Sequence, residues 1–496
     1  MDAFDEAYSV GVPDTLPRPR RTERGGTAGP RSREDRGAGS RPTQPPTPQP
    51  PAPEPMRALP TLGEPVALGG SILRSDGSLA RGWITVEGDR IAAIESTKPR
   101  HVEHAITTGG VIVPGLIDLH GHPEYNVFAP WEPPKTFINR GQWRNSDEYA
   151  ALVREPWSRL TSGGAEESVK KAMTRYAEVR AAVGGVTAIQ GASKDYPNKA
   201  EALVRNVDLL IFGTQVARST VDFDRLRDDD IESIRKGIFD TKTVKAHYVH
   251  LAEGQKTNEA SVREFERFAA SPLFSSATVM IHGTALTRDH FDQLADKGGS
   301  LVWSPQSNLR LYDETTDVAA ALAAGLPVAL GADWMPSGSP SLLHELKIAA
   351  EVVAQTPGLD LEPPDLVRMI TSGAAEIAAL GDQIGTLDVG RTADLTVIQK
   401  RRDDPYESVV AAYPSWVDLV MIGGDVIYGR PDWVAELTGA EGATQYEQVR
   451  AWGRHLLLDT RFGSPEEGPP TGPPRRLAEM RAQLIARYPA VGPIFA

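Results

Sequence analysis

The sequence of 496 residues contains no cysteine. Disulfide bonds, thiolate metal ligands and cysteine nucleophiles are therefore excluded, which leaves His, Asp and Glu as the strong metal ligands. No apolar run approaches the roughly 18 residues of a membrane-spanning helix, and the opening residues, MDAFDEAYSV, lack a basic start followed by an apolar run. We expect a soluble, cytoplasmic protein without a membrane partner.

An excess of basic charge is also lacking, because 53 Lys and Arg stand against 66 Asp and Glu, for a formal net charge of −13. A phosphate backbone is bound by a basic surface, so this balance argues against nucleic acid as a partner. The hydrophobic fraction of 40% is that of a globular protein. The length suits one large α/β barrel with an attached domain, or two to three ordinary domains.

Large apolar side chains are scarce in residues 1–56, which are dominated by Pro, Gly, Arg, Ser and Thr and include the run PTQPPTPQPPAPEP. Such a segment buries too little surface to offset the entropy lost on ordering. We expect a disordered tail with polyproline character near its end. A solvated extension is the simplest interpretation of its arginines, although they could hold a partner.

Short alternating strands with turn residues fill 64–100, where Asp76-Gly77 and Gly88-Asp89 are hairpin signals. A matching set returns in 384–399 and 418–429. Neither set is large enough to stand alone, so residues 57–110 and 384–432 are expected to pair into one small β-sandwich formed by the two ends of the chain. Residues 433–496 are expected to form a helical extension, with helices around YEQVRAWGRHLLLD and RRLAEMRAQLIARY.

The middle of the chain, 111–383, alternates helix-like and strand-like segments. This alternation predicts an α/β fold with a parallel sheet, and its length suits a TIM-type (β/α)8 barrel, which could be distorted. An eighth strand is expected between 218 and 244. The seven strand candidates are 116–119, 186–191, 208–217, 244–254, 277–283, 300–305 and 326–333.

Metal-ligand residue types stand at the ends of these strand candidates. His120 and His122 are separated by one residue, so on a strand they point the same way and can share a metal ion. His250, His282 and Asp333 each end another apolar segment, which is where a parallel barrel keeps its chemistry. The other histidines are interpreted as structural: His247, three residues before His250, and His101, His104, His290, His344 and His455.

The motifs PGLIDLHGH, GVTAIQ, VHLAE, VMIHG, SPQSNLRL, LGADW and GTLDVGRTADLTVI, spread over about 64–430, resemble the amidohydrolase superfamily. The resemblance is to the branch of cytosine, guanine and S-adenosylhomocysteine deaminases and triazine hydrolases. It implies a proton shuttle at Glu253 and a neighbour of the attacked group at His282. It also implies metal ligands at His120, His122, His250 and Asp333, and a site-lining segment at Gln306, Ser307 and Asn308.

The chemistry of this set is coherent. Three imidazoles and a carboxylate suit one divalent metal ion, Zn²⁺ or alternatively Fe²⁺, which lowers the pKa of bound water from near 16 to about 7. Hydroxide would add to a carbon that bears nitrogen, and the amine leaves only when protonated. Glu253, or Asp333 through the water, would carry that proton, while His282 donates a hydrogen bond where charge develops. The expected reaction is hydrolytic deamination of a heterocyclic or amidine-like small molecule.

The sequence departs from the family pattern at several points. Trp303-Ser304 stands where the branch has a histidine, which would alter the pocket wall, and neither Lys242 nor Lys245 ends a strand as a metal-bridging lysine would. One metal ion is therefore favoured. The loop 123–143 is expected to set specificity, with its aromatics either packing as a lid or stacking on substrate. The substrate-binding candidates are Tyr125, Asn126, Trp131, Arg140, Trp303, Gln306 and Asn308.

Two alternatives stay open. The site could hydrolyse an amide, a lactam or a ring substituent, as imidazolone and triazine hydrolases do, and release of ammonia would separate the two reactions. Some relatives keep the barrel as non-catalytic assembly proteins, and a metal-free purified protein would favour that reading. The terminal helices could pack on the barrel or on a second subunit, which leaves a homo-oligomer open.

Overall fold

The computed structural model describes residues 64–74, 76–161, 167–191, 202–209, 211–460 and 476–495. The predicted tail, 1–56, lies outside these residues. Among the described helices, none is long and apolar enough to cross a membrane. The helices are α2 (Arg140–Arg144), α3 (Asp147–Tyr149), α4 (Glu155–Thr161), α5 (Glu167–Val183), α6 (Asp228–Arg235), α7 (Glu259–Ala269), α8 (Arg288–Asp296), α9 (Pro305–Tyr312), α10 (Val318–Ala323), α11 (Leu342–Gln355), α12 (Pro363–Arg368), α13 (Ser372–Ile377), α14 (Pro405–Val410), α15 (Pro431–Ala443) and α16 (Leu477–Arg487).

The first strands of the described chain form two antiparallel hairpins. β1 (Val66–Leu73) pairs with β2 (Leu79–Glu87), and β2 pairs with β3 (Arg90–Glu95). The turns lie at the predicted Asp76-Gly77 and Gly88-Asp89, where both glycines have positive φ, 78° and 58°. This backbone region favours glycine, so the turn chemistry of the sequence sets the register of both hairpins.

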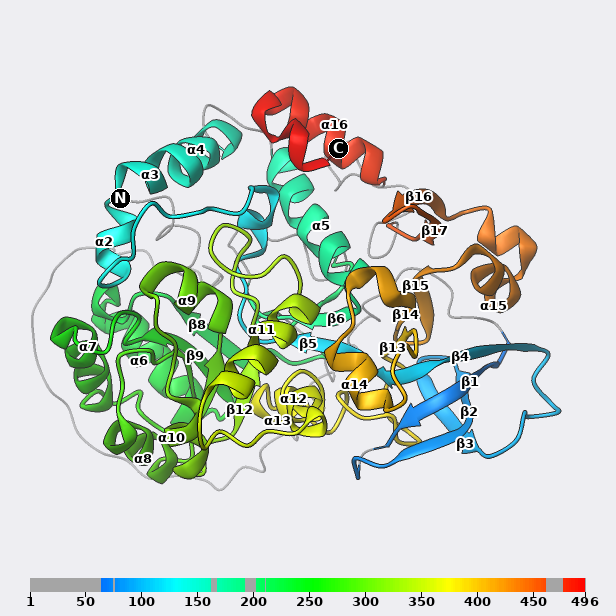
Figure 1. The fold of residues 1–496 in the computed structure, drawn as a ribbon, viewed down its shortest axis with the longest axis horizontal. Helices are drawn as coiled ribbons and strands as arrows, with labels where there is room; N and C mark the ends of the chain where they lie inside the picture. The colour runs from blue at the N-terminus through cyan, green and yellow to red at the C-terminus, as the bar shows by residue number, and fades with distance from the viewer. Residues whose placement is uncertain are drawn as a thin grey trace, which may run out of the picture. The chain divides into compact units, whose positions relative to one another are not determined.

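Strands from the two ends of the chain share one sheet. β4 (His104–Pro114) runs parallel to β1 and antiparallel to β13 (Leu395–Ile398). Beyond β13 the sheet continues through β14 (Val417–Ile422) and β15 (Asp425–Gly429), so the blue and orange strands of Figure 1 lie side by side. Apolar side chains from both sets form one buried cluster. Strands that lie far apart in the sequence therefore meet in one sheet.

The helix predicted around YEQVRAWGRHLLLD is wrong. The segment is a hairpin of β16 (Glu447–Ala451) and β17 (Arg454–Leu458). β17 pairs with β15, and the two strands of the hairpin bring the sheet to nine strands. Trp452 and Gly453, both with positive φ, make its turn. Pairing with β15 supplies hydrogen bonds that an isolated segment lacks, and this tertiary gain overrides helix propensity. The second predicted helix is present as α16, which packs against α5.

Two further sheets are parallel throughout. The order of the first is β12-β11-β10-β9-β8, and the order of the second is β5-β6-β7. Most of the helices listed above lie between these strands in sequence, as a βαβ arrangement requires. The strands are β5 (Leu116–Asp118), β6 (Val186–Ile189), β7 (Arg205–Asn206), β8 (Ala217–Thr220), β9 (Ala246–Leu251), β10 (Thr278–His282), β11 (Ser300–Trp303) and β12 (Val328–Leu330).

The predicted strand at 208–217 is wrong in position. The chain pairs before it, in β7, and at its end, in β8, with a turn bridged by Ile211 and Thr214 between them. Phe212 and Gly213 both have positive φ, which a strand does not allow. Ile211 and Val216 are buried because the turn packs against the apolar interior. With β7 and β8 in place of the one predicted strand, the described parallel sheets contain eight strands.

Side chains alternate between two apolar clusters along the parallel strands. On β9, Tyr248 joins a cluster that also contains Ile281 of β10 and Ile117 of β5, whereas Val249 and Leu251 belong to a second cluster that includes the helices. The first cluster receives side chains from strands of both parallel sheets. The two sheets therefore face one common apolar interior, as the two-residue period of a strand requires.

Polar contacts join the two parallel sheets on both sides. Asp333, after β12, donates its N–H to the carbonyl of His120 at 2.8 Å, and its own carbonyl accepts from the N–H of His122 at 3.2 Å. On the other side, the Asp208 carboxylate accepts from Gln190 Nε2 at 3.0 Å and from Ser219 Oγ at 2.7 Å. Side-chain bonds thus take over where the backbone ladder between β7 and β8 is interrupted.

A buried ion pair links the parallel strands to the nine-stranded sheet. Arg205 of β7 donates Nε and Nη2 to the two carboxylate oxygens of Asp394 at 2.6 and 2.9 Å. Asp394 also accepts from the N–H of Gly423 at 2.7 Å. Both ionic side chains are buried, so water cannot take the place of a lost partner.

Arg205→Met should lower the free energy of unfolding by about 3–5 kcal/mol, because it leaves the Asp394 carboxylate buried and unpaired. Urea unfolding measures this change. The double variant Arg205→Met/Asp394→Asn should recover part of the loss, since it removes the uncompensated charge. A double variant less stable than Arg205→Met would show that the charge is not the cause.

Candidate active site

Six titratable side chains predicted from strand ends come together at the carboxyl ends of the parallel strands. Each is buried, with no more than 5% of its surface exposed. They come from four different strands or the turns directly after them, and no other segment separates them. They are His120, His122, His250, Glu253, His282 and Asp333.

The nitrogen and oxygen atoms of this cluster face one another. His120 Nε2 lies 3.0 Å from His250 Nε2 and 3.3 Å from Asp333 Oδ1, and His122 Nε2 lies 3.4 Å from the same oxygen. Ligand atoms of His120, His250 and His282 lie within 4.8 Å of one another, as do those of His120, His122 and Asp333. His120 belongs to both groups, so the atoms surround one shared space.

The backbone bends sharply where it delivers these side chains. His282 and Asp333 have φ of 69° and 63°, a region that non-glycine residues rarely adopt and that costs of order 1–3 kcal/mol. Between the two leading histidines, a Cβ on Gly121 would lie 2.8 Å from the Gln190 carbonyl oxygen. Glycine there lets the end of β6 approach, so the His-Gly-His spacing serves both packing and side-chain direction.

Burial sets the protonation of the cluster. It lowers the pKa of His120 and His250 well below the ordinary range and that of His122 to about 3, and neighbouring imidazoles and the cation of Arg140 or Arg144 act in the same direction. Burial raises the pKa of Asp333 well above its usual value. Neutral imidazoles around a buried carboxylate are the donor set that a divalent cation requires, and the residues fit such an ion.

His282 differs from the other histidines because a charged and a polar partner oppose the effect of burial on its pKa. Burial lowers the pKa of His282, whereas the Glu253 carboxylate, 3.7 Å from Nε2, and the bond to Asn308 raise it. Asn308 Oδ1 lies 2.9 Å from Nδ1 and accepts its proton. The neutral ring therefore presents a lone pair at Nε2, and His282 donates from that atom only as an imidazolium.

One helix, α9, holds several members of the cluster in place. Ser304, which caps it, lies 2.7 Å through Oγ from His120 Nδ1; Asn308 bonds His282; and Tyr312 donates its hydroxyl to Glu253 Oε1 at 2.6 Å. These residues are four apart, so they share one face of the helix. Ser307 adds a hydrogen bond to Asp333. Fixing one ring nitrogen in this way aims the other at the shared space.

Glu345 of α11 supports the start of α9. Its Oε1 accepts from the N–H of Gln306 at 3.1 Å, and its Oε2 bonds the hydroxyl of Ser339. Burial raises the pKa of Glu345 to about 8, so the carboxyl is protonated at neutral pH. A protonated carboxyl can satisfy both contacts, by accepting through one oxygen and donating through the other.

The loop 123–143 covers the cluster with aromatic rings. Tyr125, Trp131 and Trp143 are buried, and ring centroids of Tyr125 and Trp143 lie 5.4 and 5.7 Å from that of Trp334, which itself lies 6.1 Å from His122. Of the two alternatives for these aromatics, the structure has them packed as a lid. Trp334, directly after Asp333, is the centre of that packing.

Four substrate-binding candidates contact parts of the protein other than the histidines. Asn126 Oδ1 accepts from Met335 N at 2.9 Å, and Trp131 donates its backbone N–H to Pro336, so both hold the loop after β12. Trp303 packs in the apolar cluster that also contains Val249 and Leu251, and its indole N–H donates to Thr315 Oγ1 at 2.8 Å. Gln306 contacts Glu345 through its backbone. None of these contacts involves the histidines of the cluster.

Arg140 of α2 is paired with carboxylates of the protein. Its Nη2 donates to Glu264 Oε1 at 2.7 Å, and Nη1 donates to the Val221 carbonyl at 2.7 Å and lies 3.7 Å from Glu253 Oε2. Sequence reasoning predicted Arg140 as a substrate ligand and overlooked Tyr312. The signal for Tyr312 was its spacing of four residues from Asn308, on the same helical face.

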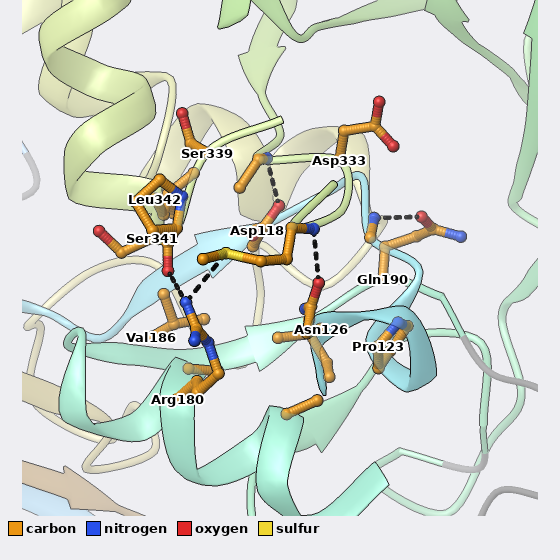
Figure 2. A pocket seen from close by; sticks show the side chains of 17 residues that line it. Asp118, Pro123, Asn126, Arg180, Val186, Gln190, Asp333, Ser339, Ser341 and Leu342 are labelled. Atoms are coloured by element: carbon orange, nitrogen blue, oxygen red, sulfur yellow. Dashed lines mark hydrogen bonds between the residues drawn. The ribbon is translucent and has the colours of Figure 1, made fainter. Parts of the chain in front are cut away.

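A cavity of about 40 Å³ lies behind the cluster, next to Asp118, Asn126 and Arg180. Arg180 donates Nη2 to Met335 Sδ at 3.2 Å and to the Pro340 carbonyl at 3.0 Å. Figure 2 shows the Asp333 carboxylate directed away from Asp118. This volume holds a few water molecules and no heterocycle. Gly121 and Asp333 of the cluster line one side of it.

The buried imidazoles and carboxylates at the ends of the parallel strands have the donor types of a site for a divalent metal ion. Residues 241–427 match the family model described as Amidohydrolase family. The chain is further similar to deaminases and to triazine hydrolases.

The comparisons extend over most of the chain. A 5-methylthioadenosine/S-adenosylhomocysteine deaminase of Halobacterium salinarum is 27% identical over 404 residues, which cover 72% of this chain and 89% of that protein. The atrazine chlorohydrolase of Arthrobacter aurescens, solved with zinc, shares the fold with a TM-score of 0.60 at 18% identity over 73% of this chain and 95% of that one. The guanine deaminase of C. acetobutylicum also shares the fold, with a TM-score of 0.52 and 15% identity, over 73% of this chain and 99% of that one.

His250→Ala should abolish binding of the metal ion, because it removes one imidazole from the space that the cluster surrounds. Elemental analysis of protein purified without added metal should find about one Zn or Fe per wild-type chain. The matched control is His247→Gln on the same strand, whose Nε2 bonds Thr220 Oγ1 at 2.9 Å and whose ring faces Phe268. Equal metal loss in both variants would contradict the assignment.

Glu345→Gln should flatten the pH dependence of stability in the metal-free protein. The folded pKa of about 8 exceeds the ordinary 4.5, so the stability that the protonated group contributes is complete below pH 4.5 and lost as the pH rises toward 8. Between pH 5 and pH 7 the wild type should lose about 2 kcal/mol relative to Glu345→Gln. Urea unfolding at both pH values measures this, with exposed Glu351→Gln on α11 as control; parallel pH curves would refute it.

Proposed function

We propose that this protein is a metal-dependent hydrolase that removes an amino group from a heterocyclic or amidine-like small molecule. One observation carries the proposal: Glu253, anchored by Tyr312, lies with Oε2 3.7 Å from His282 Nε2. The His282 ring in turn lies 4.8 and 5.3 Å from the rings of His120 and His250. A group that can transfer protons thus stands next to a site for a divalent cation. The deaminase relative from Halobacterium salinarum supports this choice among hydrolytic reactions.

The two parallel sheets are, in this proposal, parts of one distorted (β/α)8 barrel. Eight parallel strands share one apolar interior, and contacts at Asp333 and at Asp208 join the sheets on both sides. The described residues within 111–383 form this catalytic barrel. The described residues within 57–110 and 384–432 form the small β domain, which corresponds to the expected sandwich, and β16 and β17 extend its sheet.

His120, His122, His250 and Asp333 hold one divalent ion, Zn²⁺ or alternatively Fe²⁺. A bound ion of this kind acts as a Lewis acid that makes a water molecule reactive at neutral pH. One ion suits the site because the strand that would carry a bridging lysine, β8, ends at Thr220, and no lysine lies between that residue and Arg227. The zinc in the solved atrazine chlorohydrolase supports the choice of metal.

Glu253 moves the protons of the reaction. Its Oε2 takes a proton from the attacking water and returns it to a ring nitrogen or to the leaving amine, which departs as ammonia. Asp333, in the same buried space, is the alternative acceptor of the first proton. Burial lowers the pKa of His282, so the ring begins the reaction neutral; a proton received from Glu253 Oε2, 3.7 Å away, would let Nε2 donate to the position where negative charge develops.

The aromatic lid excludes water and admits substrate only when it moves. None of the six cluster residues is more than 5% exposed, so entry requires displacement of the loop 123–143. Closure then returns Trp143 and Tyr125 to their packing on Trp334. Because water is then excluded from the site, each electrostatic contact is stronger during the reaction.

Glu253→Gln should lower kcat for ammonia release by about 10²- to 10⁴-fold, because the amide cannot accept the water's proton. The measurement is an ammonia assay over a panel of aminated purines, pyrimidines and triazines, with metal content determined in parallel and expected to stay unchanged. Exposed Glu266→Gln on α7 is the control.

Hydrolysis without ammonia would instead indicate cleavage of a lactam, an amide or another ring substituent. A metal-free wild type that hydrolyses nothing after reconstitution would overturn the proposal in favour of a non-catalytic protein.

A further inference from the structure

A chain of hydrogen bonds runs from the lid to Glu253. Trp143 of α2 donates Nε1–H to the hydroxyl oxygen of Tyr312 at 2.8 Å, and that hydroxyl donates to Glu253 Oε1 at 2.6 Å. Trp143 and Tyr312 are buried, as is Glu253. The two bonds connect three segments of the chain: the loop 123–143, the last turn of α9 and the turn after β9.

The direction of both bonds is fixed by chemistry. An indole nitrogen can only donate, so the Tyr312 oxygen must accept from Trp143. The Tyr312 proton is then directed at the carboxylate, which is the better acceptor. Burial and the neighbouring Glu253 raise the pKa of Tyr312 well above the ordinary value, which keeps the proton on the hydroxyl.

The two oxygens of Glu253 consequently have different surroundings. Oε1 accepts from Tyr312, whereas Oε2 lies 3.7 Å from His282 Nε2 and 3.7 Å from Arg140 Nη1. Arg140 is itself held at 2.7 Å by Glu264, so it is a fixed cation beside the carboxylate. Because the last torsion of a glutamate is broad, a single strong bond at Oε1 decides where Oε2 points.

We propose that Tyr312 is a positioning residue that presents Glu253 Oε2 for proton transfer, and that Trp143 makes this presentation depend on a closed lid. The inference rests on the proposed function. Trp143 and Arg140 both come from α2, so opening of the lid withdraws the donor behind Tyr312 and the cation beside Oε2 together. Proton transfer is then competent only while water is excluded.

Tyr312→Phe should lower kcat by about 10- to 100-fold with KM changed less than about twofold, because a carboxylate displaced by 1 Å loses rate on this scale. Trp143→Phe, which keeps a ring in the lid, should lower kcat by about 3- to 10-fold. The double variant should be no slower than Tyr312→Phe alone, since the indole acts only through the hydroxyl. Steady-state ammonia release measures all three variants.

The control is Tyr428→Phe on β15, a buried tyrosine whose hydroxyl has no partner within the described residues. It should leave kcat and KM unchanged. Metal content should be equal in all variants, because none of the substitutions touches an imidazole of the cluster. Losses that multiply in the double variant, a loss confined to KM, or an unchanged kcat in Tyr312→Phe would overturn the inference.

A second cycle separates this inference from the proposed function. The stabilities of the wild type, Trp143→Phe, Tyr312→Phe and the double variant, measured by urea unfolding without substrate, should be non-additive if the bonds form one chain. Additive stabilities would overturn the chain itself, whatever the activity. A wild type without ammonia release but with non-additive stabilities would overturn the proposed function, and the positioning role with it, while leaving the chain of bonds intact.

Discussion

The hydrogen bonds from one face of α9 are the interaction on which the active site depends. Strand ends place the six side chains, but an imidazole or a carboxylate at a strand end can still rotate. Ser304, Asn308 and Tyr312 remove that freedom, one for each of three different strands. Glu345 holds the first turn of the helix, so a displacement there would be felt at His120, His282 and Glu253 together. A rigid helix in this position makes the geometry of the cluster a property of one element.

The apolar surroundings raise the cost of any error in this arrangement. The cluster sits above an interior of Tyr248, Ile281 and other buried side chains, where no solvent compensates a lost partner. The same burial keeps the imidazoles neutral and makes the Asp333 carboxylate unfavourable without a cation. The apolar interior below the site therefore favours binding of a positive charge, and the hydrogen bonds from α9 reduce the freedom of the side chains that would bind it.

The sequence predicted what depends on local pattern and missed what depends on distant partners. His120, His250, His282 and Asp333 were found because a histidine or aspartate after an apolar strand is visible within ten residues. Asn308 was predicted as a residue that lines the site, but not as the partner of His282. Ser304 and Tyr312 were missed, because they lie 184 and 59 residues from the groups they hold and a tyrosine in a helix is usually core. β7 was missed because two residues show no period. β16 and β17 were assigned to a helix because their strand form depends on pairing with each other and, for β17, with β15.

The pairing of β4 with β13 has a consequence for how the chain folds. Pro114 lies opposite Leu395, so the chain between them is a loop of about 280 residues closed at its base by one ladder. During synthesis, β1 to β4 leave the ribosome long before β13 exists, and this edge of β4 has no partner until the residues between them have been made. Contacts of such large sequence separation slow folding. A chaperone that shields the exposed edge of β4 would therefore be most useful to this protein early, while the buried histidines are still being translated.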